Sequence, residues 1–409
     1  MSASMHVLPN GLTVAVDPIA GAESVSVGLY AKVGSRSEPE TLGGLAHLVE
    51  HMVFKGAGGR DTRTLAEAIE DVGGSLNAWT ARDQTVFHGR ALARDLPLVT
   101  RLIADLVRAP HFDEEHLERE KQVILSELGE VIDSPDDLVH DHLFEAAFEG
   151  QSIGRPVIGS EQSVRAITRQ DCLDWLNQQL VPSRLILAAG GKVEPQALLA
   201  LAEQLFGDMG PAEAPAVSSA TFTGGVRSDR RSFEQAHWCM AFSGVPAGDE
   251  RIPALSCFVQ ALGGGTSSRL FQEMREERGL AYSIYAWNHA FADVGLVGIG
   301  CAADRARAAE SVRLARELLG DTADKLTEAE LDRARAQMEA GLLMTLETPQ
   351  GRADHIARSI EVFGRILTLD ELLRQIRSVT LASARAAGRA LLEGPVAVAS
   401  VGAALALAA

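Results

Sequence analysis

Two histidines and a glutamate lie within five residues of one another, in the segment His47-Leu-Val-Glu-His51. Apolar residues surround them at helical spacing: Leu45, Leu48, Val49, Met52 and Val53. In a helix, residues four apart share a face, so both imidazoles can bind one metal ion. Glu50 could then reach water at that ion as a general base without being a ligand. This order of residues, HxxEH, is one of the motifs of zinc hydrolases, although two exposed helical histidines would give the same pattern by chance.

A third metal ligand is expected on a separate element, because a catalytic zinc site usually has three protein ligands. Residues 113–131 predict a helix in which Glu120 and Glu127, two turns apart, share a face with Val123 and Ile124. Burying a carboxylate without a partner is costly, so metal ligation or a hydrogen bond to a ligand histidine would explain both residues. Glu127 is the preferred ligand and Glu120 the next candidate. Solvent-exposed charge explains the other acids of this helix better: Glu114, Glu115, Glu118 and Glu130.

The elements around these residues predict an α+β fold with two similar domains in tandem, each a mainly antiparallel sheet with helices packed on it. In the first half, strands are expected at 12–16, 24–31, 75–80, 85–92 and 185–190, and helices at 42–53, 64–72, 95–107, 113–131, 138–148 and 195–206. The second half repeats this order, with strands at 236–243, 281–286, 295–301 and 396–401 and helices at 252–262 and 267–276. The expected domains are therefore 1–206 and 224–409, joined by a linker at 207–223 that is rich in Gly, Pro, Ala and Ser.

The composition limits the classes of function. A chain of 409 residues is long enough for two domains of about 200 residues each. Its 55 acidic and 38 basic residues give a net charge of −17, which argues against nucleic acid as a partner. The four cysteines form no CxxC pair, which favours buried thiols in a reducing compartment. No signal peptide or membrane-spanning stretch is evident, so a cytoplasmic protein with no membrane partner is expected.

With these residues in view, the chain resembles the pitrilysin (M16) family of zinc peptidases, in particular its short bacterial members similar to the mitochondrial processing peptidase. The family joins HxxEH to a glutamate 76 residues after the second histidine, which falls here on Glu127, and carries another glutamate seven residues earlier, here Glu120. The resemblance covers nearly the whole chain. It includes four further segments: Leu76 to Thr80, Asp83 to Thr85, the RPVIGS run containing Gly159, and Leu262 to Arg269 followed by Arg275 and Tyr282.

The resemblance implies a zinc-dependent endopeptidase that hydrolyses unfolded peptides or presequence-like segments with a metal-activated water. One Zn²⁺ per chain is expected, bound by His47, His51 and Glu127, with Glu50 as the base and Glu120 supporting a ligand histidine. The second domain has no HxxEH, since Ala254 to Ala261 occupy its matching helix, and is expected to bind no metal.

Two further pairs of residues take their roles from the resemblance. Arg275 and Tyr282 would stabilise the substrate and the developing oxyanion, although a surface arginine and a packed tyrosine would explain them structurally. Asn77 and Ala78, on an edge strand, would hold an extended peptide.

The resemblance also bears on assembly. Two domains would form half of a clamshell chamber, which predicts a homodimer or a heterodimer with a related chain. The alternative function is that of a noncatalytic scaffold or partner subunit of a related two-chain complex.

Overall fold

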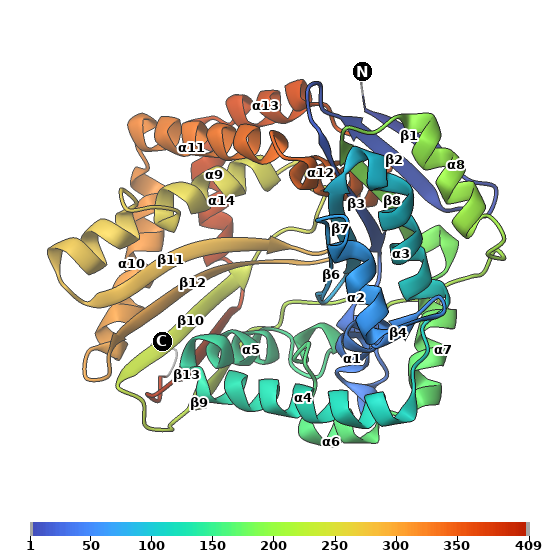
Figure 1. Cartoon of the computed structure of the whole chain (residues 1–409). Helices are drawn as coiled ribbons and strands as arrows, with labels where there is room; N and C mark the ends of the chain where they lie inside the picture. Colours follow the sequence, from blue (N-terminus) through green and yellow to red (C-terminus); the bar gives the residue numbers. More distant parts are fainter. Residues whose placement is uncertain (1–2, 406–409) are drawn as a thin grey trace. The chain divides into compact units, whose positions relative to one another are not determined.

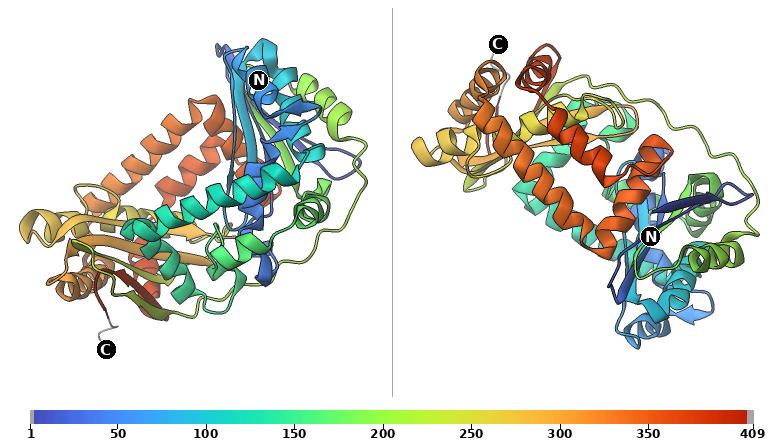
Figure 2. Two further views of the ribbon diagram at one scale, coloured as in Figure 1. Left: turned by 60° about the horizontal axis from the view of Figure 1, so that its bottom comes forward. Right: turned by 90° about the horizontal axis from the view of Figure 1, so that it is seen from above.

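The computed structural model describes residues 3–405, which form two compact units (Figures 1 and 2). The first unit comprises the chain up to Leu128 together with Pro156–Ser218 and Leu343–Leu367. The second comprises Gly129–Arg155, Ser219–Leu342 and the chain from Thr368 onward. Within the described residues, no helix has both the length and the apolar character needed to cross a membrane.

The first unit is built on a six-stranded sheet with the order β1-β2-β8-β3-β7-β6. Its strands are β1 (Ser4–Val7), β2 (Thr13–Pro18), β3 (Ser24–Ala31), β6 (Ser75–Thr80), β7 (Thr85–Leu92) and β8 (Leu185–Gly191). Only β2 and β8 pair in parallel; the other neighbours are antiparallel. Strand β6 therefore lies at an edge of the sheet, as the resemblance implied. A separate two-stranded ribbon consists of β4 (Gly56–Ala57) and β5 (Arg60–Asp61).

The second unit repeats this topology with the strand order β11-β12-β10-β13-β9. Its strands are β9 (Gly225–Asp229), β10 (Gln235–Ser243), β11 (Ala281–Ala290), β12 (Gly295–Asp304) and β13 (Val396–Val401). The parallel pair, β9 and β13, takes the place of β2 and β8. The strands β6, β7, β3, β8 and β2 of the first sheet correspond, in this order, to β11, β12, β10, β13 and β9 of the second. The predicted tandem α+β fold is therefore confirmed.

Helices cover both faces of the first sheet. The helices of this unit are α1 (Leu45–Val53), α2 (Thr62–Glu70), α3 (Leu96–Arg108), the N-terminal part of α4 (Glu114–Asp133), α6 (Glu161–Ala166), α7 (Arg169–Gln179), α8 (Pro195–Phe206) and α12 (Pro349–Phe363). The main apolar core joins the sheet to residues of α1, α3 and α8. A smaller core lies between the opposite face and α12, where Tyr30 packs with Ile356 and donates a 2.5 Å hydrogen bond to Asp354.

The second sheet is covered in a related way. The helices of this unit are α5 (Pro135–Ala147), α9 (Ile252–Gly263), α10 (Ala308–Lys325), α11 (Glu328–Leu346, which ends in the first unit), α13 (Leu369–Ser378) and α14 (Leu381–Leu392). One face forms a core with α9, α10 and α14, and the other packs against α5. The chain also has short 3₁₀ helices at Ser35–Ser37, Glu40–Leu42, Ala93–Asp95, Ser152–Gly154 and Pro182–Arg184, and a π-helix at Phe271–Glu277.

The units differ from the expected domains because each includes a helix from the other half of the sequence. Helix α5 belongs to the second unit and α12 to the first, whereas the domains expected above, 1–206 and 224–409, are continuous. The expected linker, 207–223, has no regular secondary structure from Gly210 to Thr223, and the division between units falls inside it, after Ser218. Both sheets present an apolar outer face, so each can accept a helix from either half.

Six of the eight predicted helices start one to four residues away from the observed start, among them the following two. The helix expected at 42–53 begins at Leu45, because Gly44 has a φ of +92°, a conformation that glycine adopts without strain. The Glu38 carboxylate accepts hydrogen bonds from the backbone N–H groups of Gly44 and Ala46, at 3.0 and 2.7 Å, and so caps this helix. The helix expected at 267–276 is instead the π-helix Phe271–Glu277.

Candidate metal centre

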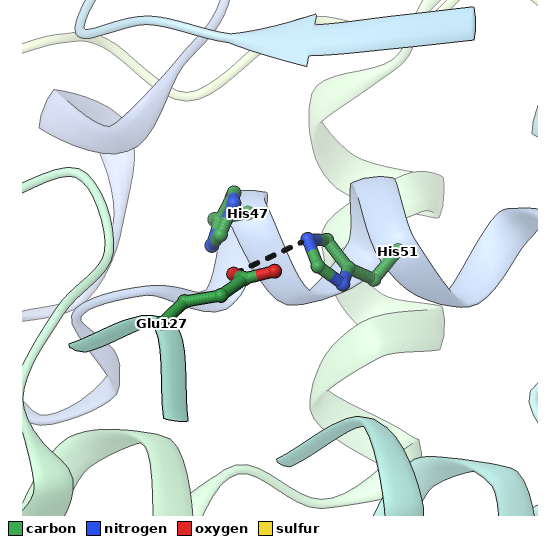
Figure 3. A group of neighbouring side chains, drawn as sticks. All are labelled: His47, His51 and Glu127. Carbon is green, nitrogen blue, oxygen red and sulfur yellow. Dashed lines mark ion pairs between the residues drawn. The ribbon is translucent and has the colours of Figure 1, made fainter. Parts of the chain in front are cut away.

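Helix α1 presents its two histidines on one side, as the spacing predicted. The ring centroids of His47 and His51 lie 4.6 Å apart with an interplanar angle of 68°. The apolar residues between and beside them are fully buried in the first unit, which fixes the rotation of the helix about its axis. Figure 3 shows both imidazoles on the same side of α1, facing a carboxylate from another helix.

That carboxylate belongs to Glu127 of α4. One ligand atom from each of His47, His51 and Glu127 lies within 4.8 Å of the others, and these three form the only such group among residues 3–405. Glu127 Oε2 lies 3.7 Å from His51 Nε2, the contact dashed in Figure 3. The Glu127 side chain is 38% exposed, so the open side of the group is accessible to water and to a substrate.

Glu120, one heptad before Glu127, contacts His51 from the other side of its ring. Its Oε2 accepts a hydrogen bond from His51 Nδ1 at 3.3 Å. A carboxylate cannot donate, so this contact places the imidazole proton on Nδ1 and leaves the Nε2 lone pair for a metal. The ε-ammonium group of Lys55 lies 2.8 Å from Glu120 Oε1.

Burial changes the acid–base properties of α1. Desolvation lowers the pKa of His47 from 6.5 to about 4, with a smaller contribution from His51, so this imidazole is neutral near pH 7. Desolvation also raises the pKa of Glu50 above its usual value. The hydroxyl of Thr80 on β6 and the neighbouring His51 oppose this rise, although Thr80 Oγ1 makes no hydrogen bond of ordinary geometry.

These residues fit a zinc ion. Two neutral imidazoles and one carboxylate form a common donor set of catalytic zinc sites, and they leave a fourth position for water or substrate. His47 Nδ1 and Glu50 Oε2 are both buried without a hydrogen-bond partner. Orphaned buried polar atoms are rare in folded proteins, and these two belong to one of the candidate ligands and to the residue next to the other histidine.

The predicted peptide-binding residues lie on β6, which has β7 as its only strand neighbour among residues 3–405. Asn77 Oδ1 accepts a 2.9 Å hydrogen bond from the backbone N–H of Ala78. The Asn77 side chain therefore satisfies a main-chain donor of this edge strand, in the absence of a further strand.

Arg275 and Tyr282 lie together in the second unit, on the π-helix and at the start of β11. The Arg275 guanidinium carbon is 5.8 Å from the centroid of the Tyr282 ring and 5.0 Å from that of Phe271. A break in the register of β11 between Ala281 and Ser283 leaves Tyr282 out of the strand pairing, and 71% of it is exposed. The two residues contact each other in the second unit, whereas His47, His51 and Glu127 all belong to the first.

Two residues at the site were not expected from the sequence. Lys55 lies four residues after His51, and continuing the helical spacing of the motif by one turn would have found it. Thr80 faces Glu50 only because β6 packs beside α1, a tertiary contact with no local signal.

Known proteins share both the sequence and the fold. Residues 13–161 match the model of the insulinase family (peptidase family M16), and residues 166–338 match that of the peptidase M16 inactive domain. An uncharacterized zinc protease of Mycobacterium bovis is 37% identical over 392 residues, covering 94% of this chain and 90% of its own. Similarly described proteins of Streptomyces coelicolor and Bacillus subtilis are 34% and 30% identical, over 94% and 91% of this chain and 86% and 91% of theirs.

Two solved structures agree in fold. A protease from Helicobacter pylori superposes with a TM-score of 0.89 at 20% identity, covering 98% of this chain and 99% of its own. A peptidase M16 inactive domain from Pseudomonas fluorescens gives 0.88 at 20% identity, with 99% of each chain covered. The sequence relatives span nearly all of this chain, and the predicted resemblance is confirmed: the chain belongs to the M16 family of peptidases.

Proposed function

We propose that this protein is a zinc-dependent endopeptidase that hydrolyses unfolded peptides. The observation that carries the proposal is the grouping of ligand atoms from His47, His51 and Glu127 within 4.8 Å, with Glu50 one residue before the second histidine. Relatives over almost the whole chain are named zinc proteases, which supports the same reading.

The chemistry divides between the metal and Glu50. When bound, zinc acts as a Lewis acid that polarises a peptide carbonyl and makes water more acidic. Glu50 takes the proton from the attacking water and passes it to the leaving amine. Its raised pKa brings it closer to neutrality, where a general base and acid can both accept and release a proton.

An extended peptide would add to β6 as a further antiparallel or parallel strand. Main-chain hydrogen bonds would then hold it next to α1, and Asn77 would release the Ala78 amide to the peptide. This mode requires several consecutive residues to be free of secondary structure, so it favours unfolded segments over folded domains.

Arg275 and Tyr282 are proposed to complete the site by contacting the substrate and the oxyanion. We propose that two chains associate, as a homodimer or with a related chain, and that the pair from one chain serves the metal site of the other. The exposure of Tyr282 and its contact with Arg275 leave both groups available for such a role.

Metal analysis combined with peptide cleavage tests the function. The purified protein should contain one zinc per chain and cleave a quenched unfolded peptide, and 1,10-phenanthroline should abolish cleavage until zinc is restored. A casein fragment and a folded domain of similar length serve as a matched pair of substrates, of which only the first should be cut. If the zinc-loaded protein cleaves nothing, alone or with a related chain, the alternative of a noncatalytic scaffold or partner subunit replaces this proposal.

A further inference from the structure

Lys55 is held in a fixed place just after helix α1. Its backbone N–H donates to the carbonyl of Met52 at 3.1 Å, which continues the last turn of the helix. Its own carbonyl oxygen lies 3.1 Å from Nδ1 of His116, a residue in the first turn of α4. The next residue, Gly56, has a φ of +132°, and a Cβ there would lie 2.5 Å from the ring of His111. Two hydrogen bonds therefore fix the Lys55 backbone, and the conformation and close packing of the next residue require glycine.

The side chain ends on Glu120. The two oxygens of that carboxylate are divided between two partners: Oε1 is 2.8 Å from Lys55 Nζ, and Oε2 is 3.3 Å from His51 Nδ1. A row of contacts thus runs from Lys55 through Glu120 to His51, whose Nε2 faces Glu127. Each step connects α1, or the turn that follows it, with α4.

The burial of the Glu120 carboxylate makes its contact with Lys55 important. The Glu120 side chain is only 9% exposed, and its contact with the imidazole of His51 occupies one of its two oxygens, so Lys55 supplies the partner of the other oxygen and a full positive charge. A buried carboxylate needs both charge compensation and a partner for each oxygen if it is to keep one orientation. Outer groups of this kind orient metal-binding histidines and commonly change metal affinity by about 10- to 100-fold when they are removed.

We infer that Lys55 is a positioning residue of the metal site: it fixes the carboxylate of Glu120, which in turn presents His51 Nε2 to the metal. The inference rests on the proposed metal site but not on peptidase turnover. The competing interpretation is an ordinary surface ion pair. Such pairs contribute little, and the chain offers one for comparison, Lys192 and Glu23, whose Nζ to Oε2 distance is also 2.8 Å but whose side chains are 55% and 78% exposed.

The test measures zinc affinity of the full chain by competition with a chromogenic chelator, together with the melting temperature of the metal-free protein. Lys55→Met should weaken zinc binding about 10-fold or more, and Lys55→Arg, which keeps the charge and can still reach a carboxylate, should recover most of the loss. Lys192→Met is the matched control and should bind zinc as the wild type does. A Lys55→Met variant with wild-type zinc affinity would refute the inference, as would a Lys192→Met variant with an equal loss.

A double-mutant cycle identifies the route of the effect. If Lys55 acts through Glu120, replacing it in a Glu120→Gln background should change zinc affinity by less than about twofold, because the intermediate carboxylate is already gone. An undiminished loss in that background would mean that Lys55 acts by another path and would overturn the inference. Should Lys55→Met fail to fold, Lys55→Gln and Lys55→Arg are compared in the same cycle. Failure of every variant and of the wild type to bind zinc would instead refute the proposed function.

Discussion

Replacing Glu50 by glutamine separates proton transfer from metal binding. The amide keeps the volume of the side chain, but it cannot take a proton from water. Glu50 contributes no atom to the ligand group of His47, His51 and Glu127, so the glutamine variant should retain its zinc. Loss of the base should lower kcat by about 10²- to 10⁴-fold, which corresponds to about 2.7 to 5.4 kcal/mol of activation free energy.

The assay follows kcat on a quenched peptide with zinc-saturated protein, alongside zinc content and the melting temperature of the metal-free form. Glu115→Gln, on an exposed part of α4, is the matched control for the loss of one carboxylate and should leave all three quantities unchanged. Because burial raises the pKa of Glu50, its carboxylate opposes folding above that pKa, and the metal-free glutamine variant should be at least as stable as the wild type at pH 8. A zinc-loaded variant with near-normal kcat would refute the assignment of Glu50 as the base. A Glu50→Gln variant that loses zinc would show that Glu50 instead helps to hold the metal-binding residues in place.

Four further experiments address other parts of the structure. Glu127→Gln should weaken zinc binding by about a hundredfold or more, since it removes a ligand, and unchanged affinity by chelator competition would exclude it as one. In the metal-free protein the pKa of His47 is about 4, below the unfolded value of 6.5. The contribution of neutral His47 to the free energy of unfolding should therefore be complete above pH 6.5 and fall by up to about 3 kcal/mol as the pH drops to 4. Urea unfolding of His47→Gln should lack this part of the pH dependence. Tyr30→Phe should lower the free energy of unfolding by about 1 to 3 kcal/mol, because it removes the hydroxyl that donates to the half-buried carboxylate of Asp354 and leaves Gln350 as its donor, and an unchanged urea midpoint would contradict this. Mixing Glu50→Gln chains with Tyr282→Phe chains should restore about a quarter of wild-type activity if dimers exchange at random and each mixed dimer holds one complete site; no recovery after demonstrated exchange would reject assembly of the site between chains.

The arrangement of the candidate ligands within each helix could be predicted, because it depends only on the spacing of residues along the sequence. Helical spacing places His47 and His51 on one face, and a separation of seven places Glu120 and Glu127 on one face of α4. The contact between these faces of α1 and α4 depends on tertiary packing, which the spacing does not predict. The helix pattern already favoured Glu127 as the third ligand, and the family resemblance supported that choice and implied a supporting role for Glu120. The structure gives the reason for this order: Glu120 contacts the Nδ1 side of His51, and Glu127 the Nε2 side.

The exchange of helices could not be predicted for a different reason. Amphipathic spacing shows which side of α5 or α12 is buried, but it does not identify the sheet that receives it. The two sheets have the same strand order and both present apolar outer faces, so the local pattern is consistent with either. For α12, polar contacts specify the first sheet: Arg352 forms an ion pair with Asp17 of β2, and Asp354 accepts a hydrogen bond from Tyr30 of β3. Residues more than 300 positions apart carry this specificity, with no signature in either segment alone.

Lys55 is not part of the HxxEH motif, although it lies only four residues after the predicted ligand His51. A motif records the groups that touch the metal, whereas Lys55 touches only Glu120, a residue that becomes a partner of His51 once α1 and α4 are in place. Beside the candidate ligands, polar contacts join these helices: Lys55 to Glu120, Glu120 to His51, and His116 to the Lys55 carbonyl. Polar contacts of this kind hold one geometry only when every partner is present. Zinc bound by residues of both helices should therefore raise the free energy of unfolding by RT ln(1 + [Zn²⁺]/Kd). A residue that holds His51 in the binding orientation should then raise both the affinity for zinc and the stability of the zinc-loaded protein.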